Sequence, residues 1–401
     1  MTLKVAVIGG GAAGFFGAIA AAEQSHDVTI FEAGPKVLSK VRISGGGRCN
    51  VTHSCFDPKE LVKCYPRGGK ELRGPLSRFQ PADTIEWFAD RGVRTKTESD
   101  GRMFPTTDDS QTIVDCLIGS AEQQSVNVRT GSKVRAITAA GDKFQIDLGL
   151  HQLEFDRVLM ASGGTRGGFA IAESLSHKII PPVPSLFTFN IQDPRISGLP
   201  GVAVEHVTCL LVADTVKFQQ QGPMLITHWG MSGPAVLKLS AWAARELHTT
   251  NYSATLRINW LPSLKTSQVQ DQLRQFREEN RKRSVESVCP FPLPKRLWKS
   301  LVDHAVGEQS VRWAELSKKA QQRLLDELTA GTFKVTGKGE FKEEFVTCGG
   351  VALNEIDFRT MQSRICPGLF FAGEILDIDG ITGGFNFQNA WTTSWIAGNS
   401  M

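Results

Sequence analysis

The chain has 401 residues, a formal net charge of +4 and 41% hydrophobic residues. This composition excludes an intrinsically disordered chain, which would be less apolar and more highly charged. So small a net charge gives no support by itself to nucleic-acid binding, and the length predicts two or three domains. The eight cysteines include no C-x-x-C pair and no zinc-like spacing, so we expect reduced thiols in a cytoplasmic protein and no metal site.

Residues 5–22 form an apolar run whose length would fit a membrane span or a signal-peptide core. Inside this run, however, a short β-branched segment at residues 5–8 is followed by glycines at 9, 11 and 14 and by a predicted helix over residues 15–24. A second predicted strand, residues 28–31, ends at Glu32. This β-α-β order with G-x-G-x-x-G spacing predicts a dinucleotide-binding fold rather than a membrane segment.

The positions of these glycines have a physical reason. Gly9 permits the tight turn, Gly11 lets the backbone approach a pyrophosphate, and Gly14 lets the helix pack closely on the strand. The positive amino end of the helix suits the pyrophosphate. Glu32 can accept hydrogen bonds from a ribose diol, and its charge disfavours a 2′-phosphate, so an NADP-type ligand is not expected at this site. The motif alone does not separate FAD from NAD.

A second glycine-rich loop, Ser-Gly-Gly-Gly-Arg-Cys-Asn, follows at residues 44–50. Three glycines in a row are often only a flexible turn, but here Arg48, Cys49 and Asn50 come directly after them. Further short motifs are spread along the chain: residues 101–105 (GRMFP), 161–164 (ASGG), 227–234 (THWGMSGP), 346–351 (VTCGGV), 368–377 (GLFFAGEILD) and 383–388 (GGFNFQ).

With these motifs in this order, the chain resembles the bacterial FAD flavoproteins that include aminoacetone oxidases and the bile-acid Δ4,6-reductase BaiN, and more distantly fumarate-reductase-type flavoproteins. The resemblance covers almost the whole chain and implies FAD as cofactor, with NAD(P)H as a transient electron donor if the protein acts as a reductase. The residues expected to bind the cofactor are Gly9, Gly11, Ala12, Ala13, Gly14, Glu32, Ala33, Lys40, Ser44, Gly45, Gly46, Arg48, Cys49, Asn50, Val134, Ala161, Ser162, Gly163, Gly373, Glu374, Asp377, Gly383, Gly384, Phe385 and Asn386.

The C-terminal motifs complete the expected site. In the family, a helix corresponding to residues 385–397 points its amino end at the N1/C2=O edge of the flavin, where it would stabilise the negative charge of the reduced form. An ordinary helix entered through a glycine turn is the alternative. Family members generally have Tyr where this chain has Phe385, so any role of that hydroxyl is lost. The link after Gly164 is shorter than in relatives, which is expected either to open the pocket or to alter substrate contacts.

The expected fold class is α/β, with a discontinuous Rossmann-type FAD-binding domain (residues 1–187 and 345–401) interrupted by a β-barrel-like plus helical insert. Strand patterns occupy residues 188–262, and charged, helix-favouring sequence occupies residues 263–344. The prolines at 181, 182 and 184 are expected to mark the boundary, because adjacent prolines interrupt both helix and sheet. Within the first domain we expect paired strands at residues 133–137 and 144–148 and a helix over residues 168–177.

His228 and Arg102 are the candidates for catalysis. His228 is the histidine that lies in a motif, and an imidazole can give or take a proton near neutral pH, although it could simply hold a loop. Arg102 and Arg48 could orient an anionic substrate or the polar edge of the flavin. A redox pair of Cys49 with Cys55 would need the fold to bring them together. The basic residues 281–283 are expected on the solvated face of a polar helix.

These observations predict an FAD-dependent oxidoreductase that transfers a hydride between flavin N5 and a small organic substrate, either an amine or an enone-type C=C, with O2 or NAD(P)H as electron partner. We expect no nucleic-acid and no membrane partner. Two alternatives stay open: a flavin-binding redox sensor or partner-binding protein without turnover, and a flavoenzyme that grips RNA through its basic helical segment. The substrate, the electron partner and the oligomeric state are not fixed by the sequence.

Overall fold

The computed structural model describes residues 1–307, 309–339 and 346–401. The chain divides into two compact units: unit 1 contains Met1–Val183 and Val346–Met401, and unit 2 contains Pro184–Phe345. Each unit has its own hydrophobic core. Unit 1 is therefore built from both ends of the chain, with unit 2 inserted between them.

A seven-stranded sheet in the order β20-β21-β22-β10-β1-β2-β6 forms the centre of unit 1. Five strands are parallel, namely β1 (Lys4–Ile8), β2 (Asp27–Phe31), β6 (Asn127–Arg129), β10 (Arg157–Met160) and β22 (Leu369–Phe371). Two short strands, β20 (Ile356–Asp357) and β21 (Gln362–Ser363), add an antiparallel edge. The apolar residues of β1 are buried because helices cover such a sheet on both faces. This arrangement confirms the predicted Rossmann-type α/β fold.

Helices α1 (Ala12–Glu23) and α13 (Phe385–Gly398) pack against each other. A Cβ on Gly17 would lie 3.2 Å from Cβ of Ser394, and a Cβ on Gly398 would lie 2.7 Å from Cβ of Ala20. Residue numbers increase in the same direction along both helices from one contact to the next. The two helices therefore run parallel, and their amino ends lie at the same edge of the sheet. When this alignment is continued toward the amino ends, the first residue of α13 lies about one turn, or about 5 Å, further out than the first residue of α1.

The remaining elements of unit 1 surround this sheet. The helices are α2 (Ser39–Gly47), α3 (Pro58–Leu61), η1 (Val62–Cys64), α4 (Gly69–Arg78), α5 (Pro81–Asp90), α6 (Gln111–Gln123), α7 (Arg166–Ser174), η3 (Leu353–Glu355) and η4 (Gly373–Ile375). Two three-stranded antiparallel sheets contain β3 (Thr52–His53), β4 (Thr95–Thr97) and β5 (Arg102–Pro105), and β7 (Ala136–Ala140), β8 (Lys143–Asp147) and β9 (Gln152–Phe155).

Two expected boundaries in unit 1 were wrong by a few residues. Strand β7 begins at Ala136, three residues after its expected start, because its partner β8 meets it from Ala136 to Ala140. Helix α7 covers residues 166–174 instead of 168–177. It starts earlier because the Thr165 side chain accepts a hydrogen bond from the N–H of Gly168 and caps the helix, and it ends earlier because Ser176 has a φ of +71°. Thr165 and Arg166 are the short link noted in the sequence.

The expectation that the prolines interrupt the sheet was also wrong. Strand β11 (Ile179–Ser185) contains Pro181, Pro182 and Pro184 and pairs with β19 (Val346–Val351). In the described part of the chain this sheet has two strands, so β11 has an outer edge at which missing N–H donors are tolerated. A Cβ on Gly349 would lie 2.5 Å from the carbonyl oxygen of Pro181, so glycine is needed for this close pairing.

Unit 2 is built on a second seven-stranded sheet, in the order β17-β16-β13-β14-β15-β12-β18. The first and last strands of this order, β17 and β18, are separated along the chain by Thr336 alone, so the sheet closes on itself. This confirms a barrel-like insert. The strands are β12 (Phe189–Asn190), β13 (Ala203–Ala213), β14 (Val216–Ile226), β15 (Gly230–Ser232), β16 (Ala254–Asn259), β17 (Gly331–Val335) and β18 (Gly337–Lys338).

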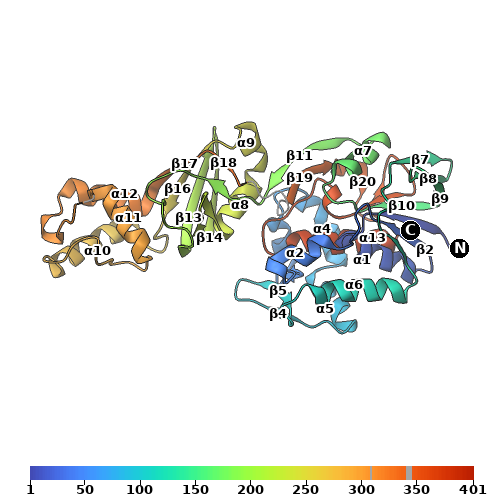
Figure 1. The fold of residues 1–401 in the computed structure, drawn as a ribbon, viewed down its shortest axis with the longest axis horizontal. Coiled ribbons are helices and arrows are strands. Elements are labelled where there is room, and N and C mark those ends of the chain that lie inside the picture. Colours follow the sequence, from blue (N-terminus) through green and yellow to red (C-terminus); the bar gives the residue numbers. More distant parts are fainter. Residues whose placement is uncertain (308, 340–345) are drawn as a thin grey trace. The chain divides into compact units, whose positions relative to one another are not determined.

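The helices of unit 2 are α8 (Pro234–Trp242), α9 (Ala244–Thr249), α10 (Thr266–Glu279), α11 (Lys295–Val306), η2 (Trp313–Glu315) and α12 (Lys318–Ala330). Figure 1 shows α10, α11 and α12 gathered beside one part of the barrel, and one hydrophobic core joins barrel and helices. The basic residues 281–283 are exposed as expected but not helical, because α10 ends at Glu279 and Asn280 caps it.

The apolar run at residues 5–22 forms β1 and most of α1 inside the core of unit 1. Among the helices of residues 1–307, 309–339 and 346–401, none has the length and apolar character needed to cross a bilayer.

Candidate functional site

The carboxyl ends of four parallel strands meet at one edge of the sheet in unit 1. Ile8 at the end of β1 pairs with Phe31 of β2 and with Met160 of β10, and Met160 pairs with Phe371 of β22. The residues that follow these strands belong to the motifs found in the sequence, and they lie side by side as a result. Ligands of open α/β sheets bind at this edge.

The three glycines of the first turn have different surroundings. Gly9 has a φ of +114°, and a Cβ there would lie 2.5 Å from the carbonyl oxygen of Ala161. A Cβ on Gly14 would lie 1.9 Å from the carbonyl oxygen of Gly9. Gly11 is the N-cap of α1, and no described atom would lie within 4 Å of a Cβ there. Gly9 and Gly14 therefore serve internal packing, whereas Gly11 borders open space at the positive end of the helix.

Glu32 is held at this edge by the backbone. Its Oε2 accepts a hydrogen bond from the N–H of Gly10 at 2.8 Å, and its Oε1 accepts one from the N–H of Gly34 at 2.7 Å. A carboxylate oxygen has lone pairs for more than one donor. The carboxylate is thus fixed in position and can still receive ribose hydroxyls.

The second glycine loop turns sharply at the end of α2. Ser44 departs from helical geometry with ψ 149°, and Gly45, Gly46 and Gly47 have φ of +58°, +70° and +84°. A Cβ on Gly45 would lie 3.0 Å from the backbone nitrogen of Asn50, but one on Gly46 or Gly47 would have no described atom within 4 Å. The loop therefore borders open space, as Gly11 does.

Cys49, at the end of this loop, is buried, and burial raises the pKa of its thiol to about 12. It stays protonated at neutral pH and is a poor nucleophile. All eight cysteines lie in the described residues and all are free thiols, so Cys49 and Cys55 do not form a disulfide here.

Asn50 links the second loop to the turn before α13. With its amide oriented to satisfy both neighbours, Asn50 accepts a hydrogen bond from the N–H of Gly384 and donates one to the carbonyl oxygen of Thr52, each at 2.9 Å. Gly384 has a φ of +92°, and a Cβ there would lie 2.5 Å from the same carbonyl oxygen. Glycine is therefore required where the two segments meet.

Gly373, directly after β22, marks the point where α1 and α13 come together. A Cβ on Gly373 would lie 3.0 Å from Cβ of Ala13 and 3.7 Å from Cβ of Ala390. The neighbouring Glu374 accepts hydrogen bonds from Lys40 Nζ and from a backbone N–H, both at 2.8 Å. The glycine turn at residues 9–14 and the turn at Gly373 come from opposite ends of the chain and thus converge on one edge of the sheet. Lys40 and Glu374, two residues expected to bind the cofactor, form an ion pair there.

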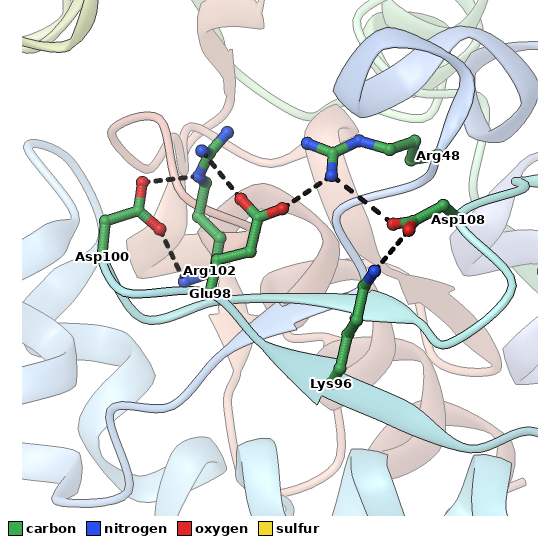
Figure 2. A network of polar contacts seen from close by, with 6 residues as sticks. All are labelled: Arg48, Lys96, Glu98, Asp100, Arg102 and Asp108. Atoms are coloured by element: carbon green, nitrogen blue, oxygen red, sulfur yellow. Dashed lines mark hydrogen bonds and ion pairs between the residues drawn. The ribbon is translucent and has the colours of Figure 1, made fainter.

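Arg48 and Arg102 are joined through Glu98 (Figure 2). Arg48 Nη1 lies 2.6 Å from one carboxylate oxygen of Glu98, and Arg102 Nη2 lies 3.0 Å from the other. The guanidinium of Arg48 also lies over the Phe104 ring, 4.0 Å from its centroid. Both predicted cations are therefore engaged with the hairpin of β4 and β5.

Three further residues complete this network. Asp100 Oδ2 accepts a hydrogen bond from Arg102 Nε at 2.7 Å, and Asp108 pairs with Arg48 at 3.5 Å and with Lys96 (Figure 2). The hydrogen bond from Lys96 lowers the pKa of Asp108. The three cations and three carboxylates balance, and all are partly exposed, so each pair is screened by water and salt.

His228 lies in unit 2, on the turn between β14 and β15, and is exposed. Its ring centroid is 6.0 Å from that of Trp229, whose side chain is 56% exposed. Gly230, with a φ of +151°, fixes the turn, because a Cβ there would lie 2.2 Å from the carbonyl oxygen of Phe189. The catalytic role of His228 stays a prediction.

Sequence reasoning missed two side chains at the amino end of α13. His53 stacks on Phe385 with ring centroids 4.8 Å apart and planes at 23°, and its Nε2 lies 3.1 Å from the carbonyl oxygen of Asp100. Tyr65 donates a hydrogen bond to the carbonyl oxygen of Phe385 at 2.8 Å. His53 stands three positions after Asn50, the last residue of the second glycine-rich loop, and this closeness to a motif was a usable signal. Tyr65 stands 320 positions from Phe385 and had none.

This arrangement fits FAD. Open space at Gly11, Gly46 and Gly47, two positive helix ends and a fixed carboxylate match a pyrophosphate, an anionic flavin edge and a ribose. The other residues expected to hold it lie after β1, β2, β6, β10 and β22 or at the start of α13: Ala12, Ala13, Ala33, Lys40, Val134, Ser162, Gly163, Gly373, Asp377, Gly383 and Asn386. The individual contacts of these residues with a cofactor stay predictions.

Over residues 3–400 the chain matches the family described as HI0933-like protein Rossmann domain. It is 30% identical to the ribosomal RNA dihydrouridine synthase of Escherichia coli strain K12, over 98% of this chain and 97% of that protein. It is 29% identical to the 3-dehydro-bile acid delta(4,6)-reductase of Clostridium scindens, over 99% and 98% of the two chains.

Solved structures show the same fold. The chain is similar to 3-ketosteroid-delta4-(5alpha)-dehydrogenase from Rhodococcus jostii RHA1, with 13% identity, a TM-score of 0.52 and coverage of 99% and 96% of the two chains. A flavocytochrome c3 fumarate reductase matches with 16% identity, a TM-score of 0.51 and coverage of 100% and 78%. By its family match and the edge at which its two glycine turns converge, the chain belongs to the HI0933-like Rossmann-domain family and is an FAD-dependent oxidoreductase.

Proposed function

We propose that this protein saturates a C=C bond conjugated with a carbonyl group in a small organic substrate, with NAD(P)H as the source of electrons. The observation that carries this proposal is the shared chemistry of two relatives that match over almost their full lengths. One is named for reduction of a 3-dehydro-bile acid at its delta(4,6) positions, and the other for forming dihydrouridine. In a 3-keto compound with delta(4,6) double bonds and in uracil, the C=C bond is conjugated with a carbonyl group, so its saturation is the same type of reaction in both.

Within unit 1, the chain's own groups would support such a reduction in two ways: they would hold the cofactor, and they would stabilise negative charge on it. When bound, FAD supplies the hydride carrier between the electron donor and the alkene. The first N–H groups of α13, behind Gly384, favour negative charge at that edge, and those of α1, behind Gly11, favour a pyrophosphate. Glu98 keeps Arg48 and Arg102 together beside the second loop.

Saturating the alkene consumes one hydride and one proton, so NAD(P)H and a proton go in and NAD(P)⁺ and the saturated product come out. His228 is the proposed proton donor, because imidazole is the side-chain group most often used as a general acid, whereas a guanidinium does not serve as one. Its exposed position on a fixed turn leaves the ring open to solvent for reprotonation.

The test is an anaerobic half-reaction series with purified, FAD-loaded protein. NADH or NADPH should bleach the flavin band, and a steroid-type dienone or a simple cyclic enone should restore it, with a product that has gained two hydrogens by mass spectrometry. Primary amines should leave the oxidised flavin unchanged. The proposal is overturned if no enone reoxidises the flavin or if an amine reduces it.

A second candidate substrate, a uracil in RNA, has its own support. Two relatives carry the name ribosomal RNA dihydrouridine synthase. Residues 263–333 contain 13 Lys and Arg but 9 Asp and Glu, a difference equal to the net charge of the whole chain. Such a segment can contact phosphates. Ribosomal RNA transcribed in vitro decides between the candidates: NADPH-dependent dihydrouridine without turnover of free enones supports RNA, and the reverse result supports the small molecule.

A further inference from the structure

The amino end of α13 is held by a short segment far away in sequence, residues 64–68. The N–H of Ile381 donates a hydrogen bond to the carbonyl oxygen of Cys64 at 2.9 Å. Gly68, with a φ of +75°, lies so close that a Cβ there would be 2.4 Å from Ile378. The chain leading into α13 is thus in direct contact with residues 64–68 along several positions.

An ion pair lies at the centre of this contact. Asp379 is fully buried and the Arg67 side chain is 11% exposed. Arg67 Nε donates to one carboxylate oxygen at 2.5 Å and Nη2 donates to the other, which is the two-pronged geometry of strong guanidinium–carboxylate pairs. A buried ion pair contributes little net stability, because desolvation offsets its attraction, but it can favour one arrangement over others.

Tyr65 adds a contact to the helix itself. Its hydroxyl donates to the carbonyl oxygen of Phe385, the first residue of α13, at 2.8 Å. Tyr65 is 3% exposed, and burial raises the pKa of its hydroxyl well above the usual value, so it remains a donor. Asn386 closes the turn by accepting from and donating to the backbone of Gly380, at 2.8 and 3.0 Å.

We propose that Tyr65, Arg67 and Asp379 are positioning residues that fix the amino end of α13 and thereby set the FAD affinity and the reduction potential of this oxidoreductase. The influence of a helix end on a charge falls off within the first turn, so a small shift of that end changes how well negative charge is stabilised. Loss of these contacts should therefore disfavour the reduced, more negative cofactor. This inference does not depend on which substrate is reduced.

The experiment compares Tyr65→Phe with the matched control Tyr252→Phe, since the chain has two tyrosines and Tyr252 lies in unit 2. FAD dissociation constants and midpoint potentials are measured on the full-length proteins. We expect Tyr65→Phe to bind FAD several-fold more weakly and to lower the potential, whereas Tyr252→Phe matches the wild type. A tenfold weaker preference for reduced FAD corresponds to a shift of about −30 mV for a two-electron couple.

The double variant Arg67→Met with Asp379→Leu tests the ion pair without leaving a buried charge unpaired. We expect it to fold, by circular dichroism and thermal unfolding, and to shift the potential negative by at least as much as Tyr65→Phe. The inference is overturned if Tyr65→Phe keeps both the wild-type potential and the wild-type FAD affinity. It is also overturned if a folded double variant does so. Turnover of substrate is not needed for either readout, so failure of the proposed reaction would be distinguishable.

Discussion

The open space beside Gly11 gives a direct test of where the cofactor lies. In a Gly11→Ala protein, the added methyl group would meet no described protein atom within 4 Å. Gly11 has φ −92° and ψ −168°, an extended conformation that alanine adopts without strain. The substitution should therefore leave the apoprotein intact and fill space that the cofactor needs.

The expected magnitudes differ for folding and for binding. Alanine is a slightly poorer N-cap than glycine but loses less entropy on folding, and these effects of about 0.5–1 kcal/mol offset each other. Displacing a pyrophosphate from one helix-end N–H removes a charge-assisted hydrogen bond of about 1.5–3 kcal/mol. That loss corresponds to roughly a 10- to 150-fold increase in the dissociation constant for FAD.

Flavin fluorescence titration of the apoprotein measures the affinity, and thermal unfolding measures stability. Gly119→Ala is the matched control, because a Cβ there also has no described atom within 4 Å but lies in α6. Gly14→Ala is the opposite control: its Cβ would lie 1.9 Å from the carbonyl oxygen of Gly9, so the fold should lose about 1–3 kcal/mol. Wild-type FAD affinity in Gly11→Ala would refute the placement of the pyrophosphate.

Three further outcomes are expected. Glu98→Gln removes the carboxylate between Arg48 and Arg102 and leaves the network with one extra positive charge, so anionic FAD should bind a few-fold more tightly at low salt but less so at high salt, measured by titration in both buffers, while thermal unfolding should show a stability change below about 1 kcal/mol; weaker binding at low salt would contradict this. Because its pKa is raised to about 12, Cys49 should resist iodoacetamide from pH 7 to 9 in the native protein and react on unfolding, as peptide mass mapping would reveal; rapid native labelling would contradict its burial. His228→Gln should slow turnover at least tenfold while FAD affinity and thermal stability stay unchanged, and unchanged turnover would exclude it as the proton donor.

Features that are determined by residues close together in the chain could be predicted from the sequence. The fingerprint at Gly9, Gly11 and Gly14 follows from the close approach of a turn to a helix, and each glycine's surroundings can be argued within a few positions. Element ends were less accurate, because a single capping hydroxyl at Thr165 moved the start of α7 by two residues. Proline was misjudged at Pro181, because whether a strand has an outer edge is decided by its partners and not by its own residues.

The residues that the sequence could not reveal act across the chain. Tyr65 and Asp379 lie in no motif. Each is recognised only by a contact in the fold, Tyr65 with Phe385 and Asp379 with Arg67, and each contact joins residues more than 300 positions apart. Arg48 and Arg102 were found as motif residues, but their common partner Glu98 was not, because a carboxylate on an exposed hairpin looks like any solvated charge. The sequence thus identified the two arginines, but the carboxylate that pairs with both could be identified only from the fold.

The parallel packing of α1 and α13 has an electrostatic consequence for the cofactor site. Each amino end carries about half a positive charge, and side-by-side parallel helices place two such ends at one edge, where they repel each other. Gly17 and Gly398 let the helices approach closely, which increases this repulsion. An anionic ligand offsets this repulsion when its negative charges lie at the amino ends of both helices. The site is therefore least favourable when empty and most favourable when one molecule spans both helix ends, which is what a dinucleotide with a pyrophosphate and a reducible, charge-accepting ring provides.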